Sequence, residues 1–406
     1  MKMNLRQAAG SLLVVGLSGA ELTALERAWL KLLRPGGVIL FRRNIQDARQ
    51  TRALLAEATA QCTPNSFRCV DVEGGTVDRL REALAAMPSA QAVALAARAS
   101  DRDAGSPTLS QRARKDVAPS FPRSQRRDLG RPERNGAGDL ARQQGELIAR
   151  GVKAFGFNTT LAPVLDLARP ESNDVMGTRS AAATAEGVVE YAREFLAGLA
   201  PHGVAGCGKH FPGLGGGALD SHLETPLIRR TSRELGRSDL VPYRALRNEL
   251  PMVMVSHAAY PETPGRNRPA SASFYWISTV LRKRIGYQGI IFSDDLEMGG
   301  ILKFMPIEEA AIAAIRAGMD LLEICHSPEP ILRAWEALMA EGERSAAFSH
   351  LLMARAARMA RARARLFAGG ASRPLTAAQF EALRGRILRF GEIVAKAQPH
   401  AEEQPA

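Results

Sequence analysis

The sequence predicts an α/β fold, a (β/α)8 barrel in which eight parallel strands alternate with helices. This barrel would form a single catalytic domain. Two observations carry this prediction. Eight short apolar runs rich in β-branched residues occur along the chain, and most are separated by helical patterns with apolar residues three and four apart. A count of eight favours a closed barrel over an open doubly wound sheet.

The strands are expected at residues 11–17, 37–41, 67–72, 159–167, 204–211, 251–258, 289–293 and 320–325. The connecting helices are expected at 22–33, 48–60, 185–199, 240–250, 274–285, 307–317 and 331–339. Residues 1–345 would form the barrel, and residues 346–406 would form C-terminal helices and a polar tail. Within the barrel, residues 100–137 are rich in Arg, Ser, Pro and Gly without periodicity, which is typical of an irregular basic insertion.

The first twenty residues have some features of a signal peptide, because Lys2 and Arg6 precede an apolar stretch. That stretch contains Gly10, Ser11 and Gly16 and runs directly into a helical pattern, so a first strand followed by a first helix fits better. No run approaches the roughly 18 apolar residues that a membrane-spanning helix needs. We therefore expect no cleavage, no membrane span and a cytoplasmic protein.

The net charge of +12 comes from two blocks rather than from one charged face. Residues 97–137 contribute +5 and residues 354–373 contribute +6. Aromatic residues make up only 5% of the chain, which leaves little for stacking on nucleic-acid bases. We expect no nucleic-acid partner. The four cysteines lie far apart, so neither disulfides nor a structural zinc site is expected.

Polar residues collect where the expected strands end, which is where barrel enzymes carry their active sites. Ionisable side chains at the end of an apolar strand are costly unless they face a wet functional rim. The residues at these ends are Asp71, Glu73, Asp166, Lys209, His210, Ser256, His257, Asp294, Asp295, Cys325 and His326.

The segment 208–222, GKHFPGLGGGALDSH, holds five glycines and is typical of a mobile loop over a substrate. It carries Asp220 and His222. At this spacing on an irregular segment, the aspartate can orient the imidazole for general acid or base work. The alternative is a surface loop with a local contact between the two side chains.

The segment 289–298, GIIFSDDLEM, delivers two consecutive carboxylates to the rim. Asp294 is a plausible covalent nucleophile toward a sugar, while Asp295 is expected to cap the following helix. A Mg²⁺ site built from Asp71, Asp166 and Asp294 is a competing reading. Lys209 and His210 argue against it, since their character suits the hydroxyls of a neutral polyol better than a dication. We expect no metal and no cofactor.

With these segments in place, the sequence resembles the single-domain branch of the family 3 glycoside hydrolases, which are β-N-acetylglucosaminidases. The loop pattern KH[F/I]PG[H/L]GxxxxD[S/T]H is matched from Lys209 to His222, and the blocks DVEGG, VMGTRS and FSDDLEM support it. One departure is Thr76, which stands where this branch usually has Arg.

The resemblance implies roles for individual side chains. Asp294 would be the nucleophile, and His222 would be the general acid/base with Asp220 as its partner. Residues that grip a terminal N-acetylglucosamine would be Asp71, Arg79, Arg179, Lys209, His210 and His257. The reaction would be a retaining double displacement, and a His in place of the usual second carboxylate is exceptional.

The resemblance also implies a physiological substrate, a peptidoglycan fragment with a non-reducing N-acetylglucosamine, and we expect a monomer. Three alternatives remain at this stage. They are a family 3 β-glucosidase, a family 3 glycoside phosphorylase whose neutral His would tolerate phosphate, and a basic binding protein on a degenerate barrel.

Overall fold

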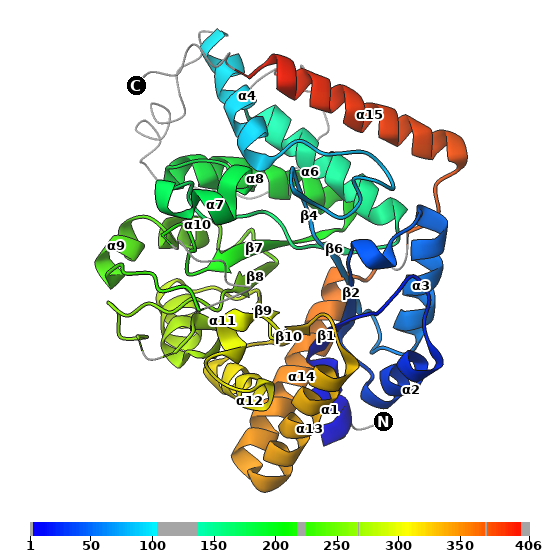
Figure 1. Cartoon of the computed structure of the whole chain (residues 1–406), viewed down its shortest axis with the longest axis vertical. Coiled ribbons are helices and arrows are strands. Elements are labelled where there is room, and N and C mark those ends of the chain that lie inside the picture. Colours follow the sequence, from blue (N-terminus) through cyan, green and yellow to red (C-terminus); the bar gives the residue numbers. More distant parts are fainter. Residues whose placement is uncertain (1–2, 104–136, 217–224, 267, 370–371, 399–406) are drawn as a thin grey trace, which may run out of the picture.

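Eight parallel strands close into a barrel in the computed structural model, which describes residues 3–103, 137–216, 225–266, 268–369 and 372–398 (Figure 1). Around the barrel the order is β1, β10, β9, β8, β7, β6, β3 and β2, so the first and last strands pair and close it. The predicted (β/α)8 barrel is confirmed. Each strand lies on one of the eight expected runs: β1 (Leu13–Gly16), β2 (Gly37–Leu40), β3 (Phe67–Val70), β6 (Thr159–Thr160), β7 (Ala205–Phe211), β8 (Met252–Val255), β9 (Ile290–Asp295) and β10 (Leu321–Ile324).

Helices cover the outside of the barrel between successive strands. They are α2 (Ala24–Leu33), α3 (Ala48–Ala60), α4 (Ala90–Asp103), α6 (Ala137–Ala154), α8 (Ala185–Leu199), α9 (Ser232–Arg237), α10 (Leu240–Ala245), the π-helix η6 (Tyr275–Arg284), α11 (Gly299–Leu302), α12 (Ile307–Ala317) and α13 (Pro328–Arg344). Their starts follow local rules. At α2, for example, Thr23 and Glu26 form a reciprocal capping box that satisfies otherwise free backbone N–H groups.

Several elements were not expected from the sequence. A short helix α1 (Leu5–Ser11) precedes β1. Helix α4 runs to Asp103 and α6 begins at Ala137, so both ends of the expected irregular segment 100–137 are helical. Residues 104–136, the rest of that segment, lie outside the described residues. A small hairpin of β4 (Val72–Gly74) and β5 (Val77–Asp78) follows β3 at the rim of the barrel.

The C-terminal helices α14 (Ala346–Leu366) and α15 (Ala377–Lys396) cover different parts of the barrel. Helix α14 packs against α1 and α13, whereas α15 lies across α4 and α6 (Figure 1). Among the described residues, no helix is long and apolar enough to cross a membrane.

Much of the positive charge of α14 is used inside the fold. Asp320, which directly precedes β10, is fully buried and accepts hydrogen bonds from Arg282 of η6 and from Arg355 and Arg358 of α14. The two bonds from α14 measure 3.1 Å, and the backbone N–H of Ile291 adds a fourth at 2.9 Å. One buried carboxylate therefore ties α14 and η6 to the amino-terminal ends of β9 and β10.

We predict that Asp320→Asn lowers the free energy of unfolding by about 3 kcal/mol, because three guanidinium groups lose the charge that compensates their partial burial. Chemical denaturation of the two proteins measures the difference. Glu57→Ala is the matched control, because Glu57 pairs with Arg27 on the exposed surface and should change stability by less than about 0.5 kcal/mol. Equal, small losses in both variants would contradict the prediction.

Candidate active site

A cavity of about 230 Å³ opens at the carboxyl ends of the barrel strands. Its walls come from β3 and the hairpin after it, from β7, from the end of β9 and from β10. The charged and imidazole side chains that line it are Asp71, Glu73, Arg79, Arg179, Lys209, His210, Asp294, Asp295, Glu323 and His326. Such a polar lining, at the end of the barrel where active sites form, marks this cavity as the candidate active site.

Lys209 of β7 joins two carboxylates in the wall of the cavity. Its ammonium Nζ lies 2.8 Å from Asp71 Oδ1 and 2.7 Å from Glu73 Oε1. Burial alone lowers the pKa of Lys209, but the negative charges of Asp71 and Glu73 outweigh it and raise that pKa. Lys209 is therefore charged, and it offsets the repulsion between two carboxylates that face the same space.

Glu73 also receives a two-pronged contact from Arg179, whose Nε and Nη2 lie 2.8 and 2.9 Å from its two oxygens. Burial raises the pKa of Glu73, but Arg179 and Lys209 outweigh burial and hold it well below its usual range. The backbone here requires glycine. At Gly74 φ is +93°, and a Cβ would approach the carbonyl oxygen of Pro88 within 2.1 Å.

Asp166 fixes His210 and the start of the glycine-rich segment. Its Oδ2 lies 2.6 Å from His210 Nδ1 and accepts the backbone N–H of the same residue at 3.1 Å. Its Oδ1 accepts the backbone N–H of Leu214 at 2.6 Å. Because one carboxylate holds the ring by Nδ1, the other ring nitrogen of His210 is left to face the cavity region.

Asp294 lies near the end of β9 and is half-buried in the cavity wall. Burial raises the pKa of its carboxyl, yet the electrostatic effects of His210, His257 and Lys209 outweigh burial, so the net pKa is lowered. Asp294 is thus a carboxylate at neutral pH. A carboxylate held charged in a polar cavity is the form that can attack an electrophilic carbon.

His257 does not line the cavity, contrary to the sequence-based expectation. The ring is fully buried behind the strand ends, with Nε2 2.9 Å from the carbonyl oxygen of Asp295 and Nδ1 2.7 Å from Ser271 Oγ. Since a carbonyl only accepts, Nε2 carries the proton and Nδ1 accepts from the hydroxyl of Ser271. Burial lowers the pKa of His257, which keeps the ring neutral. Its contacts position the backbone beside Asp294 instead of reaching a ligand.

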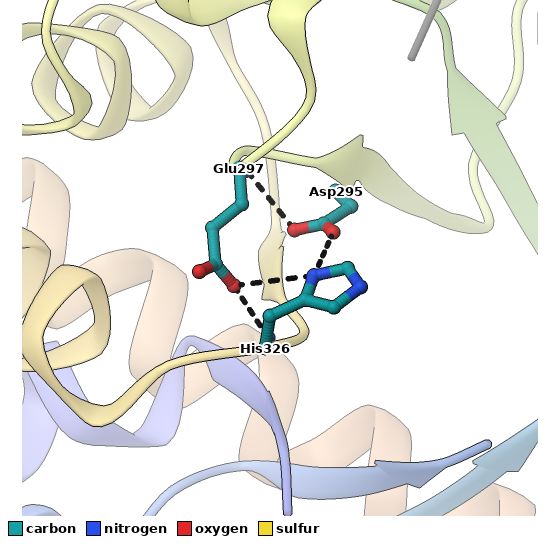
Figure 2. A group of neighbouring side chains, drawn as sticks. All are labelled: Asp295, Glu297 and His326. Carbon is teal, nitrogen blue, oxygen red and sulfur yellow. Dashed lines mark hydrogen bonds and ion pairs between the residues drawn. The ribbon is translucent and has the colours of Figure 1, made fainter. Parts of the chain in front are cut away.

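Asp295, Glu297 and His326 form a cluster at the edge of the cavity (Figure 2). His326 Nδ1 lies 3.2 Å from Asp295 Oδ2 and 3.7 Å from Glu297 Oε2. Asp295 also accepts the backbone N–H groups of Glu297 and Cys325, so it closes a turn and does not cap α11 as expected. The hydrogen bond that the His326 ring donates to Asp295 is the largest effect that raises the pKa of His326.

The same three side chains could hold a divalent ion, because their ligand atoms lie within 4.8 Å of one another. Two features explain the cluster without one. Both carboxylates already accept backbone N–H groups, and the raised pKa keeps a proton on the imidazole between them. We therefore describe the cluster as an ion-pair network.

Phe41 and Arg79 complete the rim. The Phe41 ring stacks on the His326 ring, with the two centroids 5.9 Å apart. The guanidinium of Arg79 lies 5.8 Å from the centroid of the Phe41 ring. Arg79 Nε is buried and has no hydrogen-bond partner among the described residues. Its guanidinium is thus less fully engaged than that of Arg179, which Glu73 holds at two points.

The structure brings six of the nine predicted site residues to this one cavity: Asp71, Arg79, Arg179, Lys209, His210 and Asp294. His257 lies behind it, and Asp220 and His222 lie outside the described residues. The sequence analysis noted Glu73 and Asp166 at the strand ends but gave them no part in binding a sugar, and it missed Glu323 altogether. For Glu323 a signal existed, since an acidic residue interrupts the apolar run of β10.

The chain is similar in sequence to known proteins. Residues 4–362 match the model of the Glycosyl hydrolase family 3 N terminal domain. A beta-hexosaminidase of Alkalilimnicola ehrlichii is 38% identical over 320 residues, which are 79% of this chain and 82% of that protein. A beta-hexosaminidase of Thioalkalivibrio sulfidiphilus is 37% identical over 80% of this chain and 83% of its own length.

Two solved structures share the fold. A family 3 beta-N-acetylglucosaminidase from Paenibacillus sp. has a TM-score of 0.77 at 29% identity, covering 96% of this chain and 69% of that chain. NagZ from Neisseria gonorrhoeae in complex with N-trifluoroacetyl-D-glucosamine has a TM-score of 0.69 at 29% identity, covering 96% and 98%.

We predict that Glu73→Gln lowers thermal stability most at neutral pH. A carboxyl whose pKa is lowered by folding stabilises fully above its unfolded value, about pH 4.3, and that contribution is lost as pH falls through the lowered pKa. Near pH 7 the variant should lose about 3 kcal/mol, because Arg179 keeps no charged partner at that position.

Melting curves from about pH 7 down to about pH 3 measure the trend. The gap between variant and wild type should narrow below about pH 4. Glu82→Gln is the control, since Glu82 pairs with Arg42 on the exposed surface and should show no such trend. A gap that stayed constant with pH would mean that the charge of Glu73 contributes nothing.

Proposed function

The chain belongs to glycosyl hydrolase family 3 and is a hexosaminidase of that family, and from this premise we propose that it is a retaining exo-β-N-acetylglucosaminidase. The observation that carries the proposal is the cavity in which Asp294 lies as a carboxylate among charged and hydrogen-bonding side chains. A volume of about 230 Å³ lined by charged groups suits one small polar unit such as a terminal sugar.

In this proposal Asp294 is the nucleophile. Its carboxylate oxygen attacks the anomeric carbon, a bond to that carbon forms, and the bond to the leaving oxygen breaks. The geometry supports the assignment because Asp294 lines the cavity. The neighbouring Asp295 lines it too, but its two carboxylate oxygens already contact two backbone N–H groups and His326.

Substrate binding is proposed for Asp71, Arg79, Arg179, Lys209 and His210, which all line the cavity. Lys209 and Arg179 are fixed in place by Glu73, so their remaining N–H groups meet a sugar without first losing side-chain freedom. Arg79 adds donors that no described carboxylate occupies. Charge-assisted bonds of this kind bracket hydroxyl groups strongly.

The acid/base role is proposed for His222, with Asp220 as its partner, on the matched sequence pattern. The described residues on either side support this position. Leu214 lines the cavity and is anchored by Asp166, and Thr225 Oγ1 donates to the carbonyl oxygen of Gly300 at 2.6 Å, just beyond β9. The intervening segment therefore starts and ends at the rim of the barrel.

The proposed cycle has two steps. First, His222 gives its proton to the leaving oxygen while Asp294 bonds to the anomeric carbon. Then His222 removes a proton from water, the water oxygen attacks the same carbon, and Asp294 is released as a carboxylate. Two displacements on one carbon retain its configuration. With an ordinary pKa near 6.5, a histidine can serve in both steps near neutral pH.

The proposed physiological substrate is a peptidoglycan fragment bearing a terminal N-acetylglucosamine, handled in the cytoplasm by a monomer. The similarity to NagZ from Neisseria gonorrhoeae supports the N-acetylglucosamine part of this proposal, since that protein was solved with a glucosamine analogue.

We predict that Asp294→Ala hydrolyses aryl β-N-acetylglucosaminides at least about a thousandfold more slowly than wild type. Azide should restore release of the phenol, because the small anion fits where the carboxylate was, and it should yield the α-glycosyl azide.

The wild type should prefer N-acetylglucosaminides to glucosides, and added phosphate should yield no sugar 1-phosphate.

The control is Glu381→Gln, an exposed residue on α15, which should retain wild-type rates. A β-configured azide product, or full activity of Asp294→Ala, would remove Asp294 from the nucleophile role. Accumulation of sugar 1-phosphate would instead indicate a phosphorylase.

We predict that His222→Ala slows aryl glycosides with poor leaving groups far more than those with good ones, because only poor leaving groups need a proton as they depart. A plot of log kcat/KM against the pKa of the leaving phenol should steepen relative to wild type. Asp220→Asn should steepen it less. Equal slowing across the series would exclude His222 as the acid.

A further inference from the structure

The proposed mechanism leaves one buried acid in the cavity wall without a task. Glu323 is in β10, whose other three residues are apolar, and the whole residue is 3% exposed. Its side chain lines the cavity together with Asp294 and Asp71. A carboxyl group inside a barrel strand is costly to bury, so its contacts need an account.

Only one of the two carboxyl oxygens of Glu323 has a partner. Oε1 lies 3.2 Å from Cys325 Sγ, which can donate its thiol proton. Oε2 is buried and has no hydrogen-bond partner among the described residues. The backbone of Glu323 is fully engaged, because its N–H donates to Ser293 Oγ at 2.9 Å and its carbonyl accepts the N–H of Leu296.

The groups that face Glu323 carry negative charge or none. Asp71 approaches from the end of β3, and Asp294 and Asp295 approach from β9. The thiols of Cys69 on β3 and Cys207 on β7 also lie within its electrostatic reach. Lys209, the ammonium group in this wall, is held by Asp71 and Glu73. No described cation makes an ion pair with Glu323.

These surroundings keep Glu323 protonated. Burial is the largest effect that raises its pKa well above the usual value, and the charges of Asp71, Asp295 and Asp294 add to it. The pKa of the Cys325 thiol is raised as well, again chiefly by burial, so the thiol keeps its proton. With the thiol donating to Oε1, the acid proton belongs on Oε2, the oxygen without a partner.

We propose that Glu323 is a further substrate-contacting residue, a neutral carboxylic acid on the cavity wall that donates its Oε2 hydrogen to an oxygen of the bound sugar. The proposal rests on the proposed glycosidase function and extends it to a residue that the family resemblance did not assign. Without a ligand, the buried Oε2 group has no hydrogen-bond partner among the described residues, which is unfavourable for a buried polar atom. A sugar oxygen in the cavity would supply that partner.

The carboxyl groups around Glu323 favour neutral sugars over negatively charged ones. Three ionised or ionisable carboxyl groups stand around Glu323, so a ligand oxygen that approaches it must be uncharged. A hydroxyl or an acetamido carbonyl meets that condition, whereas the carboxylate of a uronic acid does not. Neutral sugars are therefore the ligand class that this group fits.

Two variants test the proposal, with Glu323→Gln as the conservative one. The amide keeps a donor and the shape of the acid, so kcat/KM at about pH 6 should stay within about fivefold of wild type. Glu323→Leu removes the donor and should lower kcat/KM by about tenfold to a hundredfold. Glu329→Gln, an exposed change on α13, is the control and should match wild type.

The pH profile separates substrate contact from a packing role. As pH rises through the raised pKa of Glu323, wild type loses the donor and gains a negative charge, so its kcat/KM should fall. Glu323→Gln cannot ionise, so the ratio of its kcat/KM to that of wild type should rise as pH rises through the raised pKa of Glu323. The titration of His222 is common to both proteins and cancels in this ratio.

Thermal melts give a second readout with the same sign. The stability that a neutral buried acid provides is present at low pH and is lost as pH rises through its raised pKa. The melting temperature of wild type should therefore fall more than that of Glu323→Gln as pH rises through the raised pKa of Glu323. A flat activity ratio together with wild-type rates for Glu323→Leu would overturn the proposal.

The design keeps the two proposals apart. Wild type is assayed first on aryl N-acetylglucosaminides and glucosides, and the Glu323 variants are then assayed on whichever glycoside it hydrolyses. Preference for glucosides would reject the proposed specificity while still testing Glu323. If Glu323→Leu does not fold, the activity ratio of Glu323→Gln across pH decides alone.

Discussion

The ammonium group of Lys209, placed between Asp71 and Glu73, is the contact on which the candidate site depends. The ends of parallel strands bring several carboxylates to one opening, and without a shared cation they would repel one another across a poorly solvated space. Lys209 comes from β7, which is two strands away from β3 around the barrel, and its positive charge offsets that repulsion. Arg179 then completes the compensation at Glu73.

Positively charged neighbours lower the pKa of some carboxyl groups in the cavity but do not reach others. The carboxyl groups therefore differ in their protonation and in their chemistry. Asp294 lies near His210 and Lys209, which hold its pKa down despite burial. Glu323 lies in the same wall but faces mainly other acids, which raise its pKa. Pairs of carboxyl groups whose surroundings separate their pKa values are how one site holds a base and a neutral acid together at one pH.

The sequence predicted the barrel well because its strands are short apolar runs with polar residues at their ends, a pattern that local reading can detect. All eight expected runs contain a barrel strand. Helix α4 was harder to see, because it leads directly into the Arg-rich segment that disguises its end. His257 looked like a rim residue by its position after β8. Its inward orientation is decided by Ser271 and by the backbone of Asp295, contacts that no local pattern reveals.

The pairing of β1 with β10, together with the packing of α1 on α14, has a consequence for how the chain folds during synthesis. Strand β1 and helix α1 cannot make these contacts until β10 and α14 have been synthesised. Likewise, Asp320 cannot form its ion pairs with Arg355 and Arg358 until α14 has been synthesised. The barrel therefore stays open between β1 and β10 until the chain has been made as far as β10 and α14.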